Sequence, residues 1–245
     1  MSENRLGENL GIENSWKKEP INIDVEKQKE LRFNREVAFE EYLHVLGLSL
    51  DELQHKKILD VGAFRSQFAD HLLEIGADTE VISIDSRDIP PSDVSQGKNK
   101  KISRIDFMSL NLKDRLQLSE EPQFDLVLAK NSTPMMLDYQ KNGARRELLR
   151  NMNEKEITDF AFTEMSQVID SAVNHLKVGG TAIFYPIFDA KIVEYYDDKR
   201  DFRDWRLALD KKLNQLPTDK YQIEIEKVEN DIPPPAQRLK ITKIA

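Results

Sequence analysis

One stretch, residues 56–85, constrains the fold of this chain more than any other. It begins with a short, mostly apolar run at 58–61, which is typical of a strand buried on both faces of a parallel sheet. Apolar residues at helical spacing follow over 68–75, and a glycine ends them as it ends many helices. A second apolar run at 81–84 leads into Asp85. Ligands of open α/β sheets bind at the carboxyl edge, so we expect the first turn and Asp85 to lie at such a site.

The turn after the first strand contains Gly62. A chain that approaches a ligand closely, just before a helix N-terminus, needs glycine for its dihedral freedom and its missing side chain. Asp85 follows at close to the ~20 positions that separate the glycine turn from the ribose-binding acid in dinucleotide folds. Its carboxylate could accept hydrogen bonds from both hydroxyls of a ribose. The alternative is an ordinary strand-helix-strand unit in which Asp85 only caps a helix.

From about residue 36 onward, the sequence resembles the class I S-adenosylmethionine-dependent methyltransferases. The first motif of that family is an acid followed by three glycines at alternate positions, and here it reads Asp60-Val61-Gly62-Ala63-Phe64-Arg65-Ser66. The acid and the first glycine match, whereas Phe64 and Ser66 stand in place of the other two glycines. The resemblance implies S-adenosyl-L-methionine as cofactor, with its ribose on Asp85 and with Asp60, Gly62, Ala63 and Phe64 around it.

The third predicted strand, Lys101–Ile105, leads into Asp106 and Phe107. In the family resembled, an acid at this place takes the adenine amino group and an apolar neighbour packs on the ring. The resemblance therefore implies that Asp106 and Phe107 bind the cofactor. Judged by itself, Asp106 has a simpler interpretation, since an aspartate before a helix is usually its N-cap.

The fourth predicted strand, 124–129, leads to the same edge, where a substrate and the transferring methyl group would meet. Residues 135–153 are longer than a connection from strand to helix requires, and they form a candidate cap over the substrate. Packing beneath a helix explains the same residues equally well. The residues that the resemblance places at this edge are Lys130 toward the cofactor, and Asn131, Ser132 and Tyr139 toward the substrate.

Apolar residues at three- and four-residue spacing predict a long helix over 157–176. The pair Gly179-Gly180 follows it, and we expect these glycines to end the helix and turn the chain into a fifth strand at 181–185. The family resembled often carries leucine-lysine-proline-glycine-glycine at this place, and here only the proline is replaced.

After a predicted helix at 199–216, alternating strands at 221–225 and 238–242 follow with no helix between them, so they should pair antiparallel. The chain is therefore predicted to form a Rossmann-like α/β domain over 35–245. Its seven-stranded, mostly parallel sheet has helices on both faces and a C-terminal antiparallel hairpin. A nicotinamide-binding Rossmann domain would instead end on a parallel strand. Residues 1–34 form a polar arm that we expect to be partly mobile.

Composition narrows the classes of partner and chemistry. The 245 residues carry a net charge of −8 and no cysteine, which excludes disulfides, thiolate metal sites and cysteine nucleophiles. The negative charge disfavours nucleic acid and anionic membranes as partners. Because the sequence shows no long apolar run and no signal peptide, a cytoplasmic location is expected. No metal-binding constellation and no catalytic residue stands out, and the four histidines are expected to be structural.

Together these features predict methyl transfer from S-adenosyl-L-methionine to a small or medium polar substrate. In such a displacement the protein mainly aligns the nucleophile, the methyl group and the sulfur, so a strong catalytic base is not required. The alternative is a methyltransferase-like domain that has lost catalysis and serves as a binding or scaffold module.

The changed glycine motif separates these two hypotheses. If position 64 needs a positive φ, a phenylalanine there is strained and its side chain takes up part of the cofactor's space; if the turn has relaxed to a negative φ, Phe64 points away and binding survives. Because Asp85, Asp106 and the Gly179-Gly180 turn are kept, we expect measurable but weak binding, with a dissociation constant of about tens of micromolar or poorer. If steric obstruction weakens binding, the double variant Phe64→Gly, Ser66→Gly should bind S-adenosylmethionine and its demethylated product more tightly than the wild type. A calorimetric titration measures both affinities. If neither protein binds while both are well folded, the scaffold hypothesis is the better one.

Overall fold

The computed structural model describes residues 38–63, 67–87, 99–132, 151–188, 199–229 and 236–245. Some sequence-based expectations lie outside these residues, namely those for the arm at 1–34, for Phe64, for Tyr139 and for nearly all of the candidate cap at 135–153.

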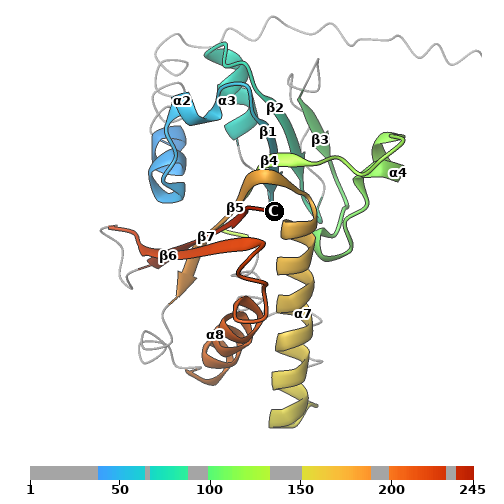
Figure 1. Cartoon of the computed structure of the whole chain (residues 1–245), viewed down its shortest axis with the longest axis vertical. Helices are drawn as coiled ribbons and strands as arrows, with labels where there is room; N and C mark the ends of the chain where they lie inside the picture. Colours follow the sequence, from blue (N-terminus) through green and yellow to red (C-terminus); the bar gives the residue numbers. More distant parts are fainter. Residues whose placement is uncertain (1–37, 64–66, 88–98, 133–150, 189–198, 230–235) are drawn as a thin grey trace, which may run out of the picture.

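Within the described residues, the strands form one seven-stranded sheet in the order β3-β2-β1-β4-β5-β7-β6 (Figure 1). Their bounds are Lys57–Val61 for β1, Glu80–Ile84 for β2, Lys100–Ile102 for β3, Phe124–Lys130 for β4, Leu176–Phe188 for β5, Tyr221–Lys227 for β6 and Ala236–Lys243 for β7. The first five strands run parallel, whereas β7 pairs antiparallel with both β5 and β6. The predicted mostly parallel sheet with a C-terminal antiparallel hairpin is confirmed.

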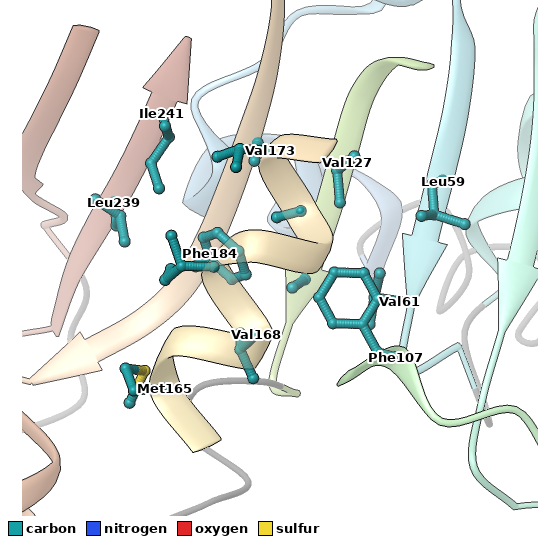
Figure 2. Close-up of a cluster of buried hydrophobic side chains, with 14 of the residues drawn as sticks. Leu59, Val61, Phe107, Val127, Met165, Val168, Val173, Phe184, Leu239 and Ile241 are labelled. Carbon is teal, nitrogen blue, oxygen red and sulfur yellow. The ribbon is translucent and has the colours of Figure 1, made fainter. Parts of the chain in front are cut away.

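Helices cover both faces of the sheet (Figure 1). One face carries α4 (Leu112–Leu116), α7 (Glu154–Asn174) and α8 (Lys199–Leu213), and the other carries the helix at 38–46, α2 (Leu50–Leu53) and α3 (Phe68–Glu74). Side chains of β1 alternate between the two faces, as expected of a strand buried on both sides. Leu59 and Val61 belong to the same apolar cluster as the buried face of α7 (Figure 2), while Ile58 packs in the opposite cluster.

The glycine pair before the fifth predicted strand has a different task from the one expected. The helix α7 ends at Asn174 without these glycines, and β5 begins two residues later. Gly179, with φ +83°, and Gly180 lie inside β5, where its register with β4 shifts. A Cβ on Gly180 would lie 2.7 Å from the carbonyl oxygen of Phe124. Gly180 therefore lets two backbones approach within the sheet, Gly179 supplies the positive φ beside it, and neither glycine terminates the helix.

Two further elements differ from the prediction. The third strand ends at Ile102 instead of Ile105, because Arg104 adopts a left-handed conformation with φ 55° that a strand cannot continue through. The short helix α2 was not predicted, although its N-terminus carries a readable signal. Ser49 and Glu52 form a reciprocal capping box in which each side chain bonds the other residue's backbone N–H.

A single arginine of β7 anchors the C-terminal end of the helix at 38–46. Arg238 donates from Nη1 to the carbonyl oxygens of His44 (3.3 Å) and Val45 (3.2 Å) in the last turn of that helix, and the His44 carbonyl also accepts from the N–H of Gly47 (3.0 Å). Its guanidinium also pairs with Glu226 of β6, with an Nε to Oε2 distance of 2.9 Å. A Cβ at Gly47 (φ +60°) would collide with this guanidinium. The helix end is therefore fitted to the C-terminal hairpin.

Replacing Arg238 with alanine should lower the free energy of unfolding by about 1–3 kcal/mol, because one change removes a charged donor from Glu226 and from the carbonyl oxygens of His44 and Val45. Chemical denaturation followed by circular dichroism measures this loss. Lys240→Ala is the matched control, because Lys240 also approaches Glu226 (3.6 Å) from β7. That change should lower stability by less than about 0.5 kcal/mol. Equal losses in the two variants would contradict the role given to the helix contacts.

Candidate functional site

The carboxyl ends of β1, β2 and β4 meet at one edge of the sheet. Val61, the last residue of β1, pairs with Ile84, the last residue of β2. Beyond that pair, the N–H groups of Gly62 (2.9 Å) and Ala63 (3.1 Å) both donate to the carbonyl oxygen of Ile84. The glycine turn is thereby held directly beside Asp85, so the two features that the sequence singled out lie next to each other.

Gly62 meets two requirements that only glycine satisfies. Its φ of +77° lies in the left-handed region, and a Cβ there would collide with the side chain of Ser132. The hydroxyl of Ser132 donates to the carbonyl oxygen of Val61 at 2.9 Å, and Ser132 is only 6% exposed. The loop after β4 therefore packs against the turn after β1.

The acid of the motif, Asp60, is buried within β1 and 2% exposed. Its Oδ1 accepts a hydrogen bond from the hydroxyl of Tyr42 at 2.7 Å, from the helix at 38–46. The Tyr42 ring stacks on Phe68 of α3, with 4.6 Å between ring centroids. Burial, and then the negative charge of Asp60 and the hydrogen bond to it, raise the pKa of Tyr42 well above its ordinary value. Tyr42 therefore stays a protonated donor at neutral pH.

Lys130, at the end of β4, also contacts the helix at 38–46. Its ammonium lies 3.0 Å from Oε1 of Glu41 and 5.4 Å from the centre of the Tyr42 ring. The next residue, Asn131, is exposed and has a left-handed φ of 52°, and its N–H donates to the carbonyl oxygen of Tyr185 at 2.7 Å. This bond ties the end of β4 to β5 and leaves the Asn131 side chain at the edge.

The second predicted acid, Asp85, is 4% exposed and is bonded by a residue two positions later. Its Oδ1 accepts from the backbone N–H (2.8 Å) and the Nε (3.0 Å) of Arg87, and its Oδ2 accepts from Nη2 at 3.3 Å. The guanidinium is thus forked across both carboxylate oxygens. The Arg87 side chain itself is 55% exposed.

The two residues predicted to hold adenine have structural tasks. Asp106 is exposed and caps the short 3-10 helix η1 (Phe107–Ser109), accepting from the N–H of Met108 at 3.0 Å. Phe107 is 5% exposed and lies in the apolar cluster near Val61 (Figure 2). Their proposed contacts with adenine remain predictions.

Sequence reasoning missed three residues of this edge, namely Glu41, Tyr42 and Arg87. Tyr42 lies in the buried apolar stripe of the helix at 38–46, where its spacing alone marks it as a packing residue. One signal was available, because Asp60 interrupts an apolar strand and a buried carboxylate needs a donor. No periodicity or motif points to Arg87.

No cluster of three or more potential metal-ligating side chains occurs among the described residues. His71 packs on the ring of Phe39 at 4.4 Å, and His175 bonds Glu121 at 2.9 Å, near the opposite edge of the sheet where β4 and β5 begin. In the described part of the chain, no helix is long and apolar enough to cross a membrane.

No protein-family model and no curated protein matches this sequence. Among solved structures, the fold is similar to that of a Clostridium thermocellum protein proposed to be an rRNA methylase. The TM-score is 0.50 at 14% identity, covering 82% of this chain and 98% of the other. At this identity the likeness concerns the fold. The chain therefore has the Rossmann-like fold that methyltransferases also have, and the predicted fold is confirmed.

Two other methyltransferases also match. A TehB-like S-adenosylmethionine-dependent methyltransferase from Corynebacterium glutamicum has a TM-score of 0.47 and 12% identity, covering 89% of this chain and 97% of the other. The plantazolicin methyltransferase, solved with S-adenosylhomocysteine, has the same score and identity over 91% and 92% of the two chains.

The bond between Tyr42 and Asp60 predicts a specific pH dependence. Tyr42 ionises near pH 10 in the unfolded chain but only at higher pH in the folded protein, so stability from this group is complete below pH ~10 and is lost as pH rises beyond it. Tyr42→Phe should therefore lower the unfolding free energy by about 1–3 kcal/mol at pH 7 and remove part of its alkaline decline. Denaturant titrations at pH 7 to 11 measure both effects.

Tyr221→Phe, which changes a half-buried tyrosine on β6, is the control for that experiment. It should change stability by no more than about 0.5 kcal/mol at pH 7 and should keep the alkaline decline. An alkaline decline of the same size in Tyr42→Phe and in the wild type would contradict the assignment.

Proposed function

We propose that this protein transfers a methyl group from S-adenosyl-L-methionine to a small or medium polar substrate. The observation that carries the proposal is the position of the Gly62 turn beside Asp85, at the carboxyl edge of a sheet ordered β3-β2-β1-β4-β5-β7-β6. Ligands of open α/β sheets bind at that edge. The sheet order with an antiparallel β7 separates this fold from nicotinamide-binding Rossmann domains.

The residues present fit the cofactor in two respects. The turn at Gly62 has the positive φ that lets a backbone pass close to a ligand, and a carboxylate stands beside it at the end of β2. Asp85 would accept hydrogen bonds from the ribose hydroxyls once Arg87 yields its place. The other residues proposed to surround the cofactor are Asp60, Ala63, Phe64, Asp106, Phe107 and Lys130.

When bound, the cofactor supplies a methyl group on a sulfonium, which is a good leaving group. The task of the protein is then to hold the acceptor atom in line and to exclude water. Asn131 is the described substrate candidate best suited to contact the acceptor, because it is exposed at the edge between β4 and β5. Ser132 instead supports the Gly62 turn, since its hydroxyl is engaged by Val61.

The net charge of −8 supports a small substrate over a long polyanion, because nucleic-acid affinity depends largely on neutralising phosphates with lysine and arginine. The simplest test of the whole proposal is mass spectrometry of protein purified without added cofactor. Co-purified S-adenosylmethionine or S-adenosylhomocysteine would support it. Absence of any binding in titration, with the protein folded, would favour the catalytically inactive scaffold.

Asp85→Ala should weaken binding of S-adenosylmethionine at least about tenfold, or ~1.4 kcal/mol, because the ribose loses its charged acceptor. Isothermal titration calorimetry measures the change, and thermal unfolding checks that the fold is retained. Asp78→Ala is the control, since Asp78 is an exposed acid paired with His55 at the opposite edge of the sheet, before β2. Unchanged affinity in Asp85→Ala would refute the assignment of the ribose acid.

A further inference from the structure

Arg87 occupies the hydrogen-bonding face of the acid proposed to hold ribose. Three donors of this one residue, the backbone N–H, Nε and Nη2, lie 2.8 to 3.3 Å from the two carboxylate oxygens of Asp85. With the guanidinium in this place, the Asp85 side chain is only 3% exposed. A ribose diol uses the same two oxygens, so the nucleoside and the guanidinium compete for one set of acceptors.

The three donors differ in how readily they can leave. The backbone N–H of Arg87 is fixed by the chain, and it bonds only Oδ1. The guanidinium is carried by a long side chain that is 55% exposed, so water can solvate it as soon as it rotates away. The carboxylate is only 3% exposed, so a ligand that displaces the guanidinium has to supply donors of its own, and two well-placed ribose hydroxyls would do so.

We propose that Arg87 is a positioning residue that closes Asp85 in the absence of nucleoside and sets how tightly the nucleoside binds. The inference rests on the proposed function, because it requires that the ribose be held by Asp85. Binding then proceeds with rotation of the guanidinium away from the carboxylate, while the backbone N–H of Arg87 keeps the carboxylate oriented. The affinity observed in the wild-type protein is reduced by the fraction of molecules in which the fork is closed.

Neutral ligands test this proposal without interference from long-range charge. S-Adenosylhomocysteine and adenosine carry no net charge, so removal of a cation does not by itself attract them. Calorimetric titrations of the wild type and of Arg87→Ala should show about three- to tenfold tighter binding of both ligands to the variant. 2′,3′-Dideoxyadenosine, which lacks the competing hydroxyls, should show no gain.

Arg206→Ala is the control protein. Arg206 also pairs with an acid, Asp210 (2.9 Å), but it lies on α8 and not at the carboxyl end of β2. It should bind all three ligands as the wild type does. Unchanged or weaker binding of adenosine to Arg87→Ala would overturn the proposal, and so would an equal gain for the dideoxy ligand. A tighter adenosine complex without a gain for the dideoxy ligand supports it.

A measurement on the wild type covers the case in which Arg87→Ala fails to fold. The Nε–H signal of Arg87 in nuclear magnetic resonance should exchange slowly with solvent in the free protein and rapidly once S-adenosylhomocysteine is bound. Unchanged exchange in the complex would overturn the proposal. If the wild type and a folded Arg87→Ala both fail to bind S-adenosylhomocysteine and adenosine, the proposed function fails together with it. If the wild type and Arg87→Ala bind these ligands with equal affinity, the proposed function is supported and only the role of Arg87 is refuted.

Discussion

A carboxylate inside a sheet has to be solvated by the protein itself, and much of this structure follows from that constraint. Asp60 is buried in β1, where an ionised side chain without donors would be prohibitively unstable. The hydroxyl of Tyr42 supplies a donor at 2.7 Å. This bond fixes the helix at 38–46 against the carboxyl end of β1, and the contact between Lys130 and Glu41 adds a second link at the same place. The position of the helix is thus set by a polar contact as well as by apolar packing.

The two acids of the edge are held in different ways. The partner of Asp60 is a buried, neutral phenol whose pKa is raised, so neither solvent nor a change of pH near neutrality replaces it. The side-chain partner of Asp85 is a guanidinium on an exposed side chain, which another donor can replace. The edge therefore combines a permanent contact at β1 with an exchangeable contact at β2. If a ligand displaces Arg87 as proposed, the contact between Tyr42 and Asp60 stays in place.

The sheet was predictable from sequence because its strands are short apolar runs, and because no helix fits between β6 and β7. The tight turn at Gly62 was predictable, because a glycine between a strand and a helix indicates a backbone with a positive φ. The position of Gly179 inside a strand was not predictable. A glycine after a helical pattern can indicate either the end of the helix or an irregularity in the following strand, and the sequence does not separate the two. Tyr42 reads as one member of an apolar helical stripe, and its hydroxyl acquires a function only from the strand that it faces. Arg87 could not be found, because a contact between neighbouring loop side chains leaves no periodic pattern.

The contact of Arg238 with the helix at 38–46 joins parts of the chain that lie almost two hundred residues apart. During synthesis the helix leaves the ribosome long before β7. Its C-terminal carbonyl oxygens can therefore accept from Arg238 only when nearly the whole domain has emerged. Insertion of β7 between β5 and β6 happens at the same late stage. Until then β5 is an open edge that can pair with other chains. The end of this helix is thus fixed, and the open edge of β5 covered, at the same late stage of synthesis.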